Sequence, residues 1–385
     1  MFSVIIFIKR DAPMKISAYR LGSDSMRINW QNGKSSIFSY FWLRDNARDP
    51  ISFDSQSHQR ELFTAMVPAE ITPDQVKLKE NGQVICIKWP DLNNFVDYDS
   101  GFLAAYLHPR AVTDVPQPKL WDASSITNDL ISFDFDCALT WSGTTEVLRK
   151  LSDYGFVLLK SCPCEKTSVA SVAKNIGYIR ETIFGGLWEF EANETMADSA
   201  YTPKELRPHT DSTYSLDAPG LQILLCLEYN ATGGESVIVD GFRVAQQLQQ
   251  DNPILYSALG QIEVTGTYKG DGAYLQASRP IFRHDSEGRI VQVTFNNYDR
   301  ATTRLAEPQM TQLYSGIRYL DCLFNSSEYQ WRHQLRPGEM IVFDNWRLLH
   351  GRGAFQGKRK MAGAYINRED YLSSLKKYDL IKYYA

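Results

Sequence analysis

The sequence contains few features that would place it outside the ordinary globular proteins. Its 385 residues carry a formal net charge of -4 with both signs interspersed. The sequence therefore has no basic stripe of the kind that would indicate a nucleic-acid partner. Internal repeats and low-complexity segments are absent from the sequence, which argues against solenoid and fibrous architectures. With 43% apolar residues, the chain can bury the core of one large domain or of two domains.

The cysteines show no pairing pattern. The six are Cys86, Cys137, Cys162, Cys164, Cys226 and Cys322. The closest pair, Cys162-Pro-Cys164, is one residue short of the CxxC spacing that redox and zinc motifs use. We therefore expect reduced thiols, as in a cytosolic protein.

The N-terminus lacks the features of a targeting segment. The apolar run from Phe2 to Ile8 is too short to cross a bilayer, and its positive charges, Lys9 and Arg10, follow it. A secretory signal has the opposite order, and no Arg-rich amphipathic transit segment is present. We expect a cytoplasmic protein without a membrane partner, for which Met14 is an alternative start.

Residues 14–106 predict a small N-terminal antiparallel β domain. Short β-rich runs, Arg27–Trp30 and Val84–Trp89, alternate with Asn-Gly pairs at 32–33 and 81–82, which favour tight hairpins. Residues 107–127 contain three prolines and little periodicity, so we interpret them as a linker.

Residues 128–385 predict a larger domain that is mainly β with flanking helices. Apolar residues recur at helical spacing from Val169 to Ile176 and from Met310 to Phe324, and Asp251 before Pro253 predicts a capped helix start. Strands are predicted at Gln222–Tyr229, Ser236–Asp240, Ile290–Asn296 and Glu339–Asn345. More strands than helices favour a double-sheet jelly roll, which is also called a double-stranded β-helix.

One short stretch combines metal-binding residue types. In Arg207–Tyr214, His209 and Asp211 are two residues apart, and on a strand such residues share a face. Two histidines and one carboxylate leave three positions open on an octahedral metal. His350, expected to approach from the far side of a barrel, can supply the third ligand. Each feature by itself also has an explanation without a metal. The His-x-Asp pair is explained by a capped loop, and His350 by a loop histidine whose hydrogen bonds are satisfied.

Nine residues after His350 stands Arg359. An arginine fork can hold a carboxylate through two parallel hydrogen bonds, which suits a dicarboxylic cosubstrate whose other end chelates the metal. In isolation, a Lys-Arg-Lys run at 358–360 is more typical of a solvated surface.

Taken together, several stretches make the chain resemble the γ-butyrobetaine and trimethyllysine dioxygenase family. The similarity runs from about Trp42 to Tyr371. The matching stretches are Arg180–Gly185, Ala200–Thr202, His209–Tyr214, Val239–Phe242, Asn296–Ala301 and Phe343–Arg352.

The resemblance implies a chemistry and a set of roles. The enzymes of this family use Fe(II), O2 and 2-oxoglutarate, with ascorbate as a supporting reductant. Carried over to this chain, His209, Asp211 and His350 are the Fe(II) ligands and Arg359 is the 2-oxoglutarate clamp. Phe184, Trp188, Tyr201 and Tyr365 form an aromatic cage for a trimethylammonium group. Such a cation has no N–H to donate, so aromatic faces are its natural receptor. Phe184 replaces the usual tyrosine and loses a hydroxyl.

The substrate choice depends on Asp198. The γ-butyrobetaine enzymes have asparagine at this position; an aspartate here would attract the α-ammonium of trimethyllysine and repel a bare carboxylate. Asn296 matches a family residue that contacts the substrate carboxylate, and alternation places it on one strand face with Gln292 and Thr294. As a strand-end residue, it is also explained by solvent exposure.

The expected reaction is hydroxylation of N6-trimethyllysine at C3, which gives 3-hydroxy-N6-trimethyllysine, succinate and CO2 in the first step of carnitine biosynthesis. A dioxygenase for γ-butyrobetaine or another small trimethylammonium compound is the first alternative. A non-catalytic trimethylammonium-binding module and a zinc hydrolase are the others. The sequence leaves open whether the lysine is free or peptide-bound, and it is compatible with a homodimer.

The N-terminal domain departs from the family. The γ-butyrobetaine enzymes bind a structural zinc through three cysteines and one histidine. This chain has Ala47, Asp49 and Ser52 at the cysteine positions and Asn93 near the histidine position. We predict that this zinc is absent, and that an apolar core including Trp42, Phe53 and Trp89 holds the domain together.

Overall fold

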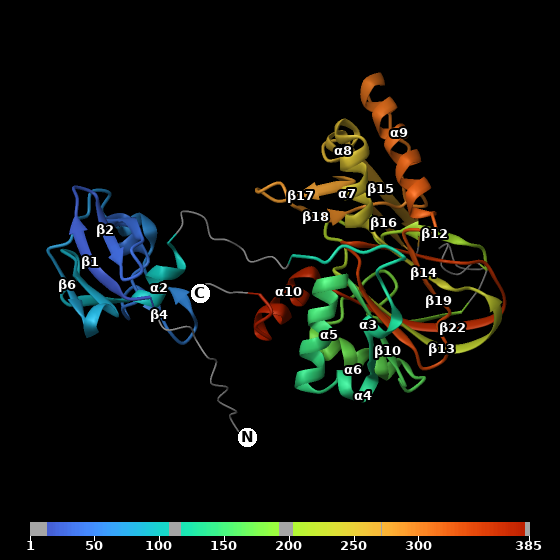
Figure 1. The fold of residues 1–385 in the computed structure, drawn as a ribbon, viewed down its shortest axis with the longest axis horizontal. Coiled ribbons are helices and arrows are strands. Elements are labelled where there is room, and N and C mark those ends of the chain that lie inside the picture. Colours follow the sequence, from blue (N-terminus) through green and yellow to red (C-terminus); the bar gives the residue numbers. More distant parts are fainter. Residues whose placement is uncertain (1–13, 108–116, 192–202, 271, 382–385) are drawn as a thin grey trace. The chain divides into compact units, whose positions relative to one another are not determined.

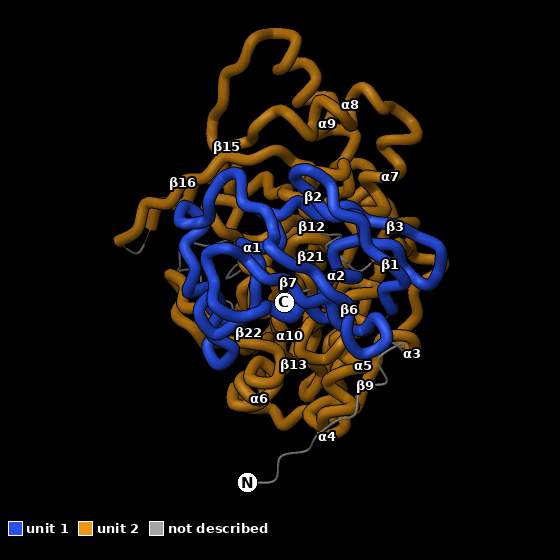
Figure 2. Tube along the Cα trace, turned by 90° about the vertical axis from the view of Figure 1, so that its left-hand side faces the viewer, with its two compact units in different colours: residues 1–113, 384–385 blue, residues 114–383 orange. Residues whose placement is uncertain are grey.

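The computed structural model describes residues 14–107, 117–191, 203–270 and 272–381. The chain divides into two compact units, residues 1–113 and 114–383 (Figure 2). In the described part of the chain, no helix is both long enough and apolar enough to cross a membrane.

Unit 1 contains two antiparallel three-stranded sheets, and each leads directly into a short helix. The first sheet comprises β1 (Ile16–Leu21), β2 (Ser25–Trp30) and β3 (Ser35–Ser39), followed by α1 (Tyr40–Asp45). The second comprises β6 (Gln75–Lys79), β7 (Val84–Lys88) and β8 (Phe95–Asp99), followed by α2 (Ser100–Ala105). A minor hairpin, β4 (Phe53–Asp54) and β5 (Gln59–Arg60), lies between them in sequence.

Both predicted Asn-Gly hairpin turns of unit 1 are confirmed. Asn81 and Gly82 have φ values of 52° and 83°, the left-handed conformation that this turn requires and that these two residues adopt most easily. The predicted core is confirmed only in part. Trp89 is fully buried, whereas Trp42 packs at the edge of the core and Phe53 lies outside it under the Arg48 guanidinium.

Unit 2 is built on two sheets that face each other, as the fold prediction expected (Figure 1). The six-stranded sheet has the order β11 (Leu187–Glu191), β22 (Phe355–Ile366), β13 (Leu221–Gly233), β20 (Met340–Asp344), β10 (Phe156–Lys160) and β9 (Ser132–Asp134). The four-stranded sheet has the order β12 (Leu206–His209), β21 (Leu348–Arg352), β14 (Ser236–Asp240) and β19 (Gln330–His333). All neighbours are antiparallel except β9 and β10.

Alternation along the strands explains how the two sheets form a jelly roll. Phe156 and Leu158 of β10 point into the core between the sheets, while Val157 and Leu159 point outward into a second core. On β14, Ile238 belongs to the same inner core, and its neighbours Val237 and Val239 point outward into a third core. Strands buried on both faces read as continuous apolar runs rather than as alternating ones.

Helices cover the outer face of each sheet (Figure 1). α5 (Trp141–Tyr154), α6 (Lys166–Ile176) and α10 (Arg368–Lys377) pack on the six-stranded sheet together with the short α4 (Phe135–Ala138). α7 (Gly241–Asp251), α8 (Pro253–Leu259) and α9 (Glu307–Phe324) pack on the four-stranded sheet. The short α3 (Asn128–Ile131) precedes β9.

The helices expected at 169–176 and 310–324 are confirmed, but the predicted cap of the third is wrong. The N-cap of α8 is Asn252, whose side chain accepts a hydrogen bond from the Leu255 amide, and Asp251 ends the preceding helix. Both residue types cap helices well. The prediction placed the cap one residue too early, because with Pro253 as the first helical residue the residue directly before it is the N-cap.

Two further hairpins extend from unit 2: β15 (Glu263–Gly270) with β16 (Ala273–Pro280), and β17 (Phe282–His284) with β18 (Ile290–Val293). The strands predicted at 222–229, 236–240 and 339–345 are confirmed as β13, β14 and β20. The strand predicted at 290–296 is too long, because pairing ends at Val293. Asn296 therefore lies in the irregular segment that follows, and its strand-face assignment is wrong.

A buried ion pair holds the start of unit 2 to the turn between β20 and β21. Arg347 donates to Asp240 at 3.1 and 2.7 Å and to the carbonyls of Asp153 and Lys119 at 2.8 and 2.7 Å. Asp240 also accepts from the Trp121 amide. From residue 117 onward, the segment interpreted as a linker thus packs on unit 2, with Trp121 only 2% exposed.

Candidate active site

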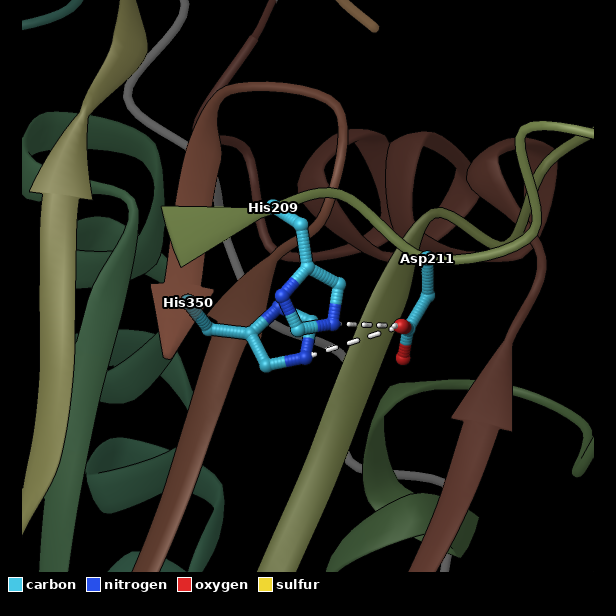
Figure 3. A group of neighbouring side chains, drawn as sticks. All are labelled: His209, Asp211 and His350. Atoms are coloured by element: carbon cyan, nitrogen blue, oxygen red, sulfur yellow. Dashed lines mark ion pairs between the residues drawn. The ribbon is translucent and has the colours of Figure 1, made fainter. Parts of the chain in front are cut away.

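The three predicted metal ligands meet in the structure. His209 on β12 and His350 on β21 are directly opposed on neighbouring strands. His209 Nε2 lies 3.5 Å and His350 Nε2 3.6 Å from Asp211 Oδ1 (Figure 3). One ligand atom from each residue fits within 4.8 Å of the others, so a single ion can contact all three.

Two details of the sequence argument are wrong. β12 ends at His209, so Asp211 belongs to the following loop and not to the same strand face. From this loop the Asp211 carboxylate still lies beside both imidazoles. His350 comes from the adjacent strand rather than from the far side of the barrel. The site forms by strand pairing between β12 and β21.

The two imidazoles have different surroundings. Burial lowers the pKa of His350 to about 4, so its ring is neutral at pH 7, the state that binds a metal. Burial opposes charge on His209 as well, but the Asp211 carboxylate outweighs it and raises the pKa of His209. His209 Nδ1 donates to the Arg207 carbonyl at 2.8 Å, which leaves Nε2 as the ligand atom.

Asp211 is fixed on every side. Asn345 accepts from its backbone amide at 2.8 Å and donates to its carbonyl at 3.2 Å, and the Tyr365 hydroxyl donates to Oδ2 at 2.7 Å. Burial alone would raise the pKa of Asp211, but His350, His209 and Tyr365 lower it well below its usual range. An ionised carboxylate and two histidines are the donor set that suits non-haem Fe(II).

Arg359 is buried although it stands between two lysines. On β22 the Lys358 and Lys360 side chains point outward and pair with Glu228 and Glu189 at 2.8 and 2.7 Å. Alternation turns Arg359 inward, where it is 6% exposed and lines one pocket with the three metal ligands. Its Nε has no hydrogen-bond partner among the described residues. A buried, incompletely paired guanidinium is costly and fits an anionic ligand.

Aromatic side chains line another part of the same pocket. They are Phe184, Trp188, Phe190, Tyr214 and Tyr365. The Trp188 and Tyr365 ring centroids are 5.7 Å apart. Trp188 lies opposite Gly363 of β22, where an added Cβ would come within 2.1 Å of the indole. The glycine therefore lets the indole lie against the strand.

The structure brings three of the four predicted cage residues together. These are Phe184, Trp188 and Tyr365; the fourth, Tyr201, and the predicted specificity residue Asp198 lie outside the described residues. The pocket-lining residues that the sequence argument did not assign to a site include Phe190, Tyr214, Gln222, Asp299 and Arg352.

Asn296 lines the pocket beside a second carboxylate. Its amide donates to Asp299 Oδ2 at 3.0 Å and to the Thr210 carbonyl at 3.3 Å, and the Thr213 hydroxyl donates to the same Asp299 oxygen at 3.2 Å. Asp211 and Asp299 are the pocket's acidic side chains within the described ranges. Asp299 is part of the Asn-Asn-Tyr-Asp-Arg-Ala stretch, but no spacing rule distinguishes it from a surface aspartate.

Comparison with known proteins agrees with this geometry. Residues 117–365 match the model of the taurine catabolism dioxygenase TauD, TfdA family, and residues 18–108 match the model of the N-terminal region of γ-butyrobetaine hydroxylase-like proteins. These two matches fall on the two compact units, one on each.

Individual relatives match over nearly the whole chain. A trimethyllysine dioxygenase of Meyerozyma guilliermondii is 29% identical over 381 residues, which is 94% of this chain and 95% of that protein. The mitochondrial trimethyllysine dioxygenase of Rattus norvegicus is 32% identical over 381 residues, covering 94% and 90%. A γ-butyrobetaine dioxygenase of Pongo abelii is 28% identical over 376 residues, covering 92% and 94%.

The family model covers the two sheets of unit 2 and contains all three residues of the His-Asp-His cluster. The donor set fits Fe(II), and the buried arginine in the same pocket fits a dicarboxylate cosubstrate. The chain therefore belongs to the TauD, TfdA family of dioxygenases, as an Fe(II)- and 2-oxoglutarate-dependent enzyme.

Proposed function

We propose that this enzyme hydroxylates N6-trimethyllysine at C3. One O2 and one 2-oxoglutarate are consumed, and the products are 3-hydroxy-N6-trimethyllysine, succinate and CO2, as in the first step of carnitine biosynthesis. One observation supports this most directly: the metal triad, a buried arginine and an aromatic wall line a single pocket. The names of the yeast and rat relatives support the choice of substrate.

Different residues of the pocket would bind the metal and the cosubstrate. His209, Asp211 and His350 would hold Fe(II), which when bound supplies the oxidative decarboxylation of 2-oxoglutarate and the hydroxylation chemistry. Arg359 would grip the distal carboxylate of 2-oxoglutarate by a charge-assisted pair of hydrogen bonds. Because the site is buried and the ligands are fixed by neighbours, little reorganisation is needed when the cosubstrate binds.

The substrate would be held at both ends. Phe184, Trp188 and Tyr365, with Tyr201, would surround the trimethylammonium group by their ring faces. Asp198 and Asn296 would contact the amino-acid end, and the structure adds Asp299 as a carboxylate hydrogen-bonded to Asn296. Fixing both ends of a flexible chain selects one carbon for reaction.

The role of Asp299 can be tested by the substitution Asp299→Asn. Loss of one charge-assisted contact to the α-ammonium should raise the KM for trimethyllysine about tenfold. The dissociation constant for 2-oxoglutarate should change less than twofold. Asp321→Asn, on the exposed face of α9, is the control and should change neither quantity. Equal losses for trimethyllysine and for 2-oxoglutarate would show that Asp299 acts on the whole site and not on the ammonium. Asp198→Asn, made in parallel, tests the residue predicted from the sequence.

The proposed reaction is tested by coupled turnover. Purified protein with Fe(II), ascorbate, 2-oxoglutarate and O2 should form succinate and hydroxylated trimethyllysine in equal amounts. A panel containing γ-butyrobetaine, choline and a trimethyllysine peptide separates free from peptide-bound substrate. Succinate formation coupled to γ-butyrobetaine and not to trimethyllysine would overturn the substrate assignment.

A γ-butyrobetaine dioxygenase is the second candidate. The Pongo abelii relative and the match of residues 18–108 favour it, and the same pocket accepts the same trimethylammonium group. The two candidates differ at the other end of the substrate, where a second acidic residue in the pocket favours an ammonium over a bare carboxylate.

We also propose that unit 1 folds without zinc. In place of thiolates, Ala47 is buried and Ser52 accepts a hydrogen bond from Arg44, which pairs with Asp91 at 2.8 Å. Elemental analysis of the purified protein should find no stoichiometric zinc.

Three further expectations stay proposals. A homodimer is tested by light scattering in solution, and the need for ascorbate by omitting it from multiple-turnover assays. We propose the cytoplasm as the compartment, while the rat relative carries the word mitochondrial in its name. Cell fractionation would distinguish a cytoplasmic from a mitochondrial location.

A further inference from the structure

Tyr365 belongs to two parts of the site at once. It lies on β22 and is 5% exposed. Its ring lines the pocket beside Trp188, with centroids 5.7 Å apart. Its hydroxyl is 2.7 Å from Asp211 Oδ2. One residue therefore connects the aromatic wall to a metal ligand.

The hydrogen bonds of Tyr365 have a defined direction. Gln222 is its cross-strand partner on β13, and the Gln222 side-chain amide donates to the Tyr365 hydroxyl at 3.5 Å. An ionised carboxylate only accepts, so the single hydroxyl proton goes to Asp211. The order of donation is Gln222 to Tyr365 to Asp211.

This arrangement makes the two oxygens of Asp211 unequal. Oδ2 accepts the hydrogen bond from Tyr365, while Oδ1 faces both imidazoles at 3.5 and 3.6 Å. An unrestrained carboxylate can bind a metal through both oxygens. If Asp211 did so, it would occupy one of the three positions that an octahedral metal keeps for cosubstrate and O2.

We propose that Tyr365 is a positioning residue whose hydroxyl restricts Asp211 to one metal-binding oxygen, while its ring forms part of the receptor for the substrate's trimethylammonium group. The ring's role rests on the proposed function; the hydroxyl's role does not. A cation over the ring withdraws electron density from the phenol and strengthens its hydrogen bond to Asp211. Occupancy of the aromatic wall is thereby linked to the metal site.

The test is Tyr365→Phe, which keeps the ring and removes the hydroxyl. Loss of a partner that orients a metal ligand should weaken metal binding about 10- to 100-fold. Co(II) serves as the probe, titrated without substrate and without turnover, and its visible spectrum reports the coordination of the ion. In the variant, the dissociation constant should rise because Asp211 is no longer held in place, and the spectrum should change because both Asp211 oxygens can now reach the ion.

Phe184→Leu is the matched control. It removes a ring from the same pocket, and Phe184 makes its ring contact with Tyr268 and not with a metal ligand. Its Co(II) affinity and spectrum should equal those of the unaltered protein, while its affinity for trimethyllysine falls. In the unaltered protein, trimethyllysine should shift the Co(II) spectrum; in Tyr365→Phe this shift should be reduced at saturating ligand.

Unchanged Co(II) affinity and spectrum in Tyr365→Phe overturn the proposal, whatever the activity. If trimethyllysine is not the substrate, the Co(II) results without substrate still hold, and only the ligand-induced shift is lost. Gln222→Met provides a second variant, because it removes the amide that orients the hydroxyl and leaves Tyr365 in place. It should weaken Co(II) binding in the same direction and by less; unchanged binding there contradicts the proposed order of donation.

Discussion

Replacing Asp211 with alanine is expected to lower turnover by about 10³-fold or more, the size of effect seen when a member of a catalytic unit is removed. Only two imidazoles then remain to hold the metal, and the charge that balances a divalent ion is lost. Fe(II)-dependent succinate formation measures the turnover, and Co(II) titration measures the loss of metal binding.

Two further variants separate metal binding from folding. Asp217→Ala lies in the same loop, where its side chain is 54% exposed and pairs with Arg180; it should retain turnover within about twofold, as exposed ion pairs contribute little. Asp211→Asn keeps an acceptor for the Tyr365 hydroxyl and should fold while still losing most turnover. Turnover above a tenth of normal in Asp211→Ala would show that the triad is not the catalytic metal site.

Replacing Arg359 with methionine is expected to raise the dissociation constant for 2-oxoglutarate about 100-fold, since two charge-assisted hydrogen bonds are lost. The free energy of unfolding of the ligand-free protein should rise or stay unchanged. Burial lowers the pKa of Arg359, and its Nε lacks a partner among the described residues. Removing an incompletely paired buried charge relieves its desolvation cost.

The two quantities are measured separately, by anaerobic titration of the Co(II)-loaded protein with 2-oxoglutarate and by thermal unfolding without ligand. Lys358→Met is the control on the same strand; its side chain is 50% exposed and pairs with Glu228, so neither quantity should change appreciably. Normal 2-oxoglutarate affinity in Arg359→Met would transfer the clamp to Arg352, which lines the same pocket and donates to the Lys204 carbonyl at 2.7 Å.

The contrast between Arg359 and its neighbours shows where local sequence reasoning stops. Taken in isolation, Lys358-Arg359-Lys360 indicates solvent exposure; in the structure Lys358 is exposed and Lys360 is half-buried, and both pair with glutamates on the outer side. A strand sends alternate side chains to opposite faces, so the middle residue faces the pocket once β22 is the strand beside β13. Its burial follows from strand pairing, which short-range composition does not encode.

For the candidate metal ligands, the sequence predicted correctly which residues come together, and only their local geometry was wrong. The residue types and their chemistry followed from the sequence, and the structure places all three together. The predicted geometry was wrong, because the strand ends at His209 and Asp211 reaches the site from the loop that follows. The placement of Asp211 beside the two histidines remained correct although its position on a strand was wrong, because a short loop can bring the carboxylate to the same place.

The sequence, with the resemblance to the family, determined several strands, among them β13, β14 and β20, and the chemical types that the site needs: two imidazoles, a carboxylate, an arginine and aromatic rings. The imidazoles, the carboxylate and the arginine depend on residue types and their chemistry, and the assignment of the aromatic rings depends on the resemblance. Only the tertiary structure decided that His350 stands beside His209 on a neighbouring strand, that Asp299 joins Asn296 in the pocket, and that Tyr365 is bonded to Asp211. Each of these contacts joins residues whose distance in space is set by strand register and loop conformation. Register is fixed by how the two sheets share one core, and so it appears only when the whole of unit 2 is assembled.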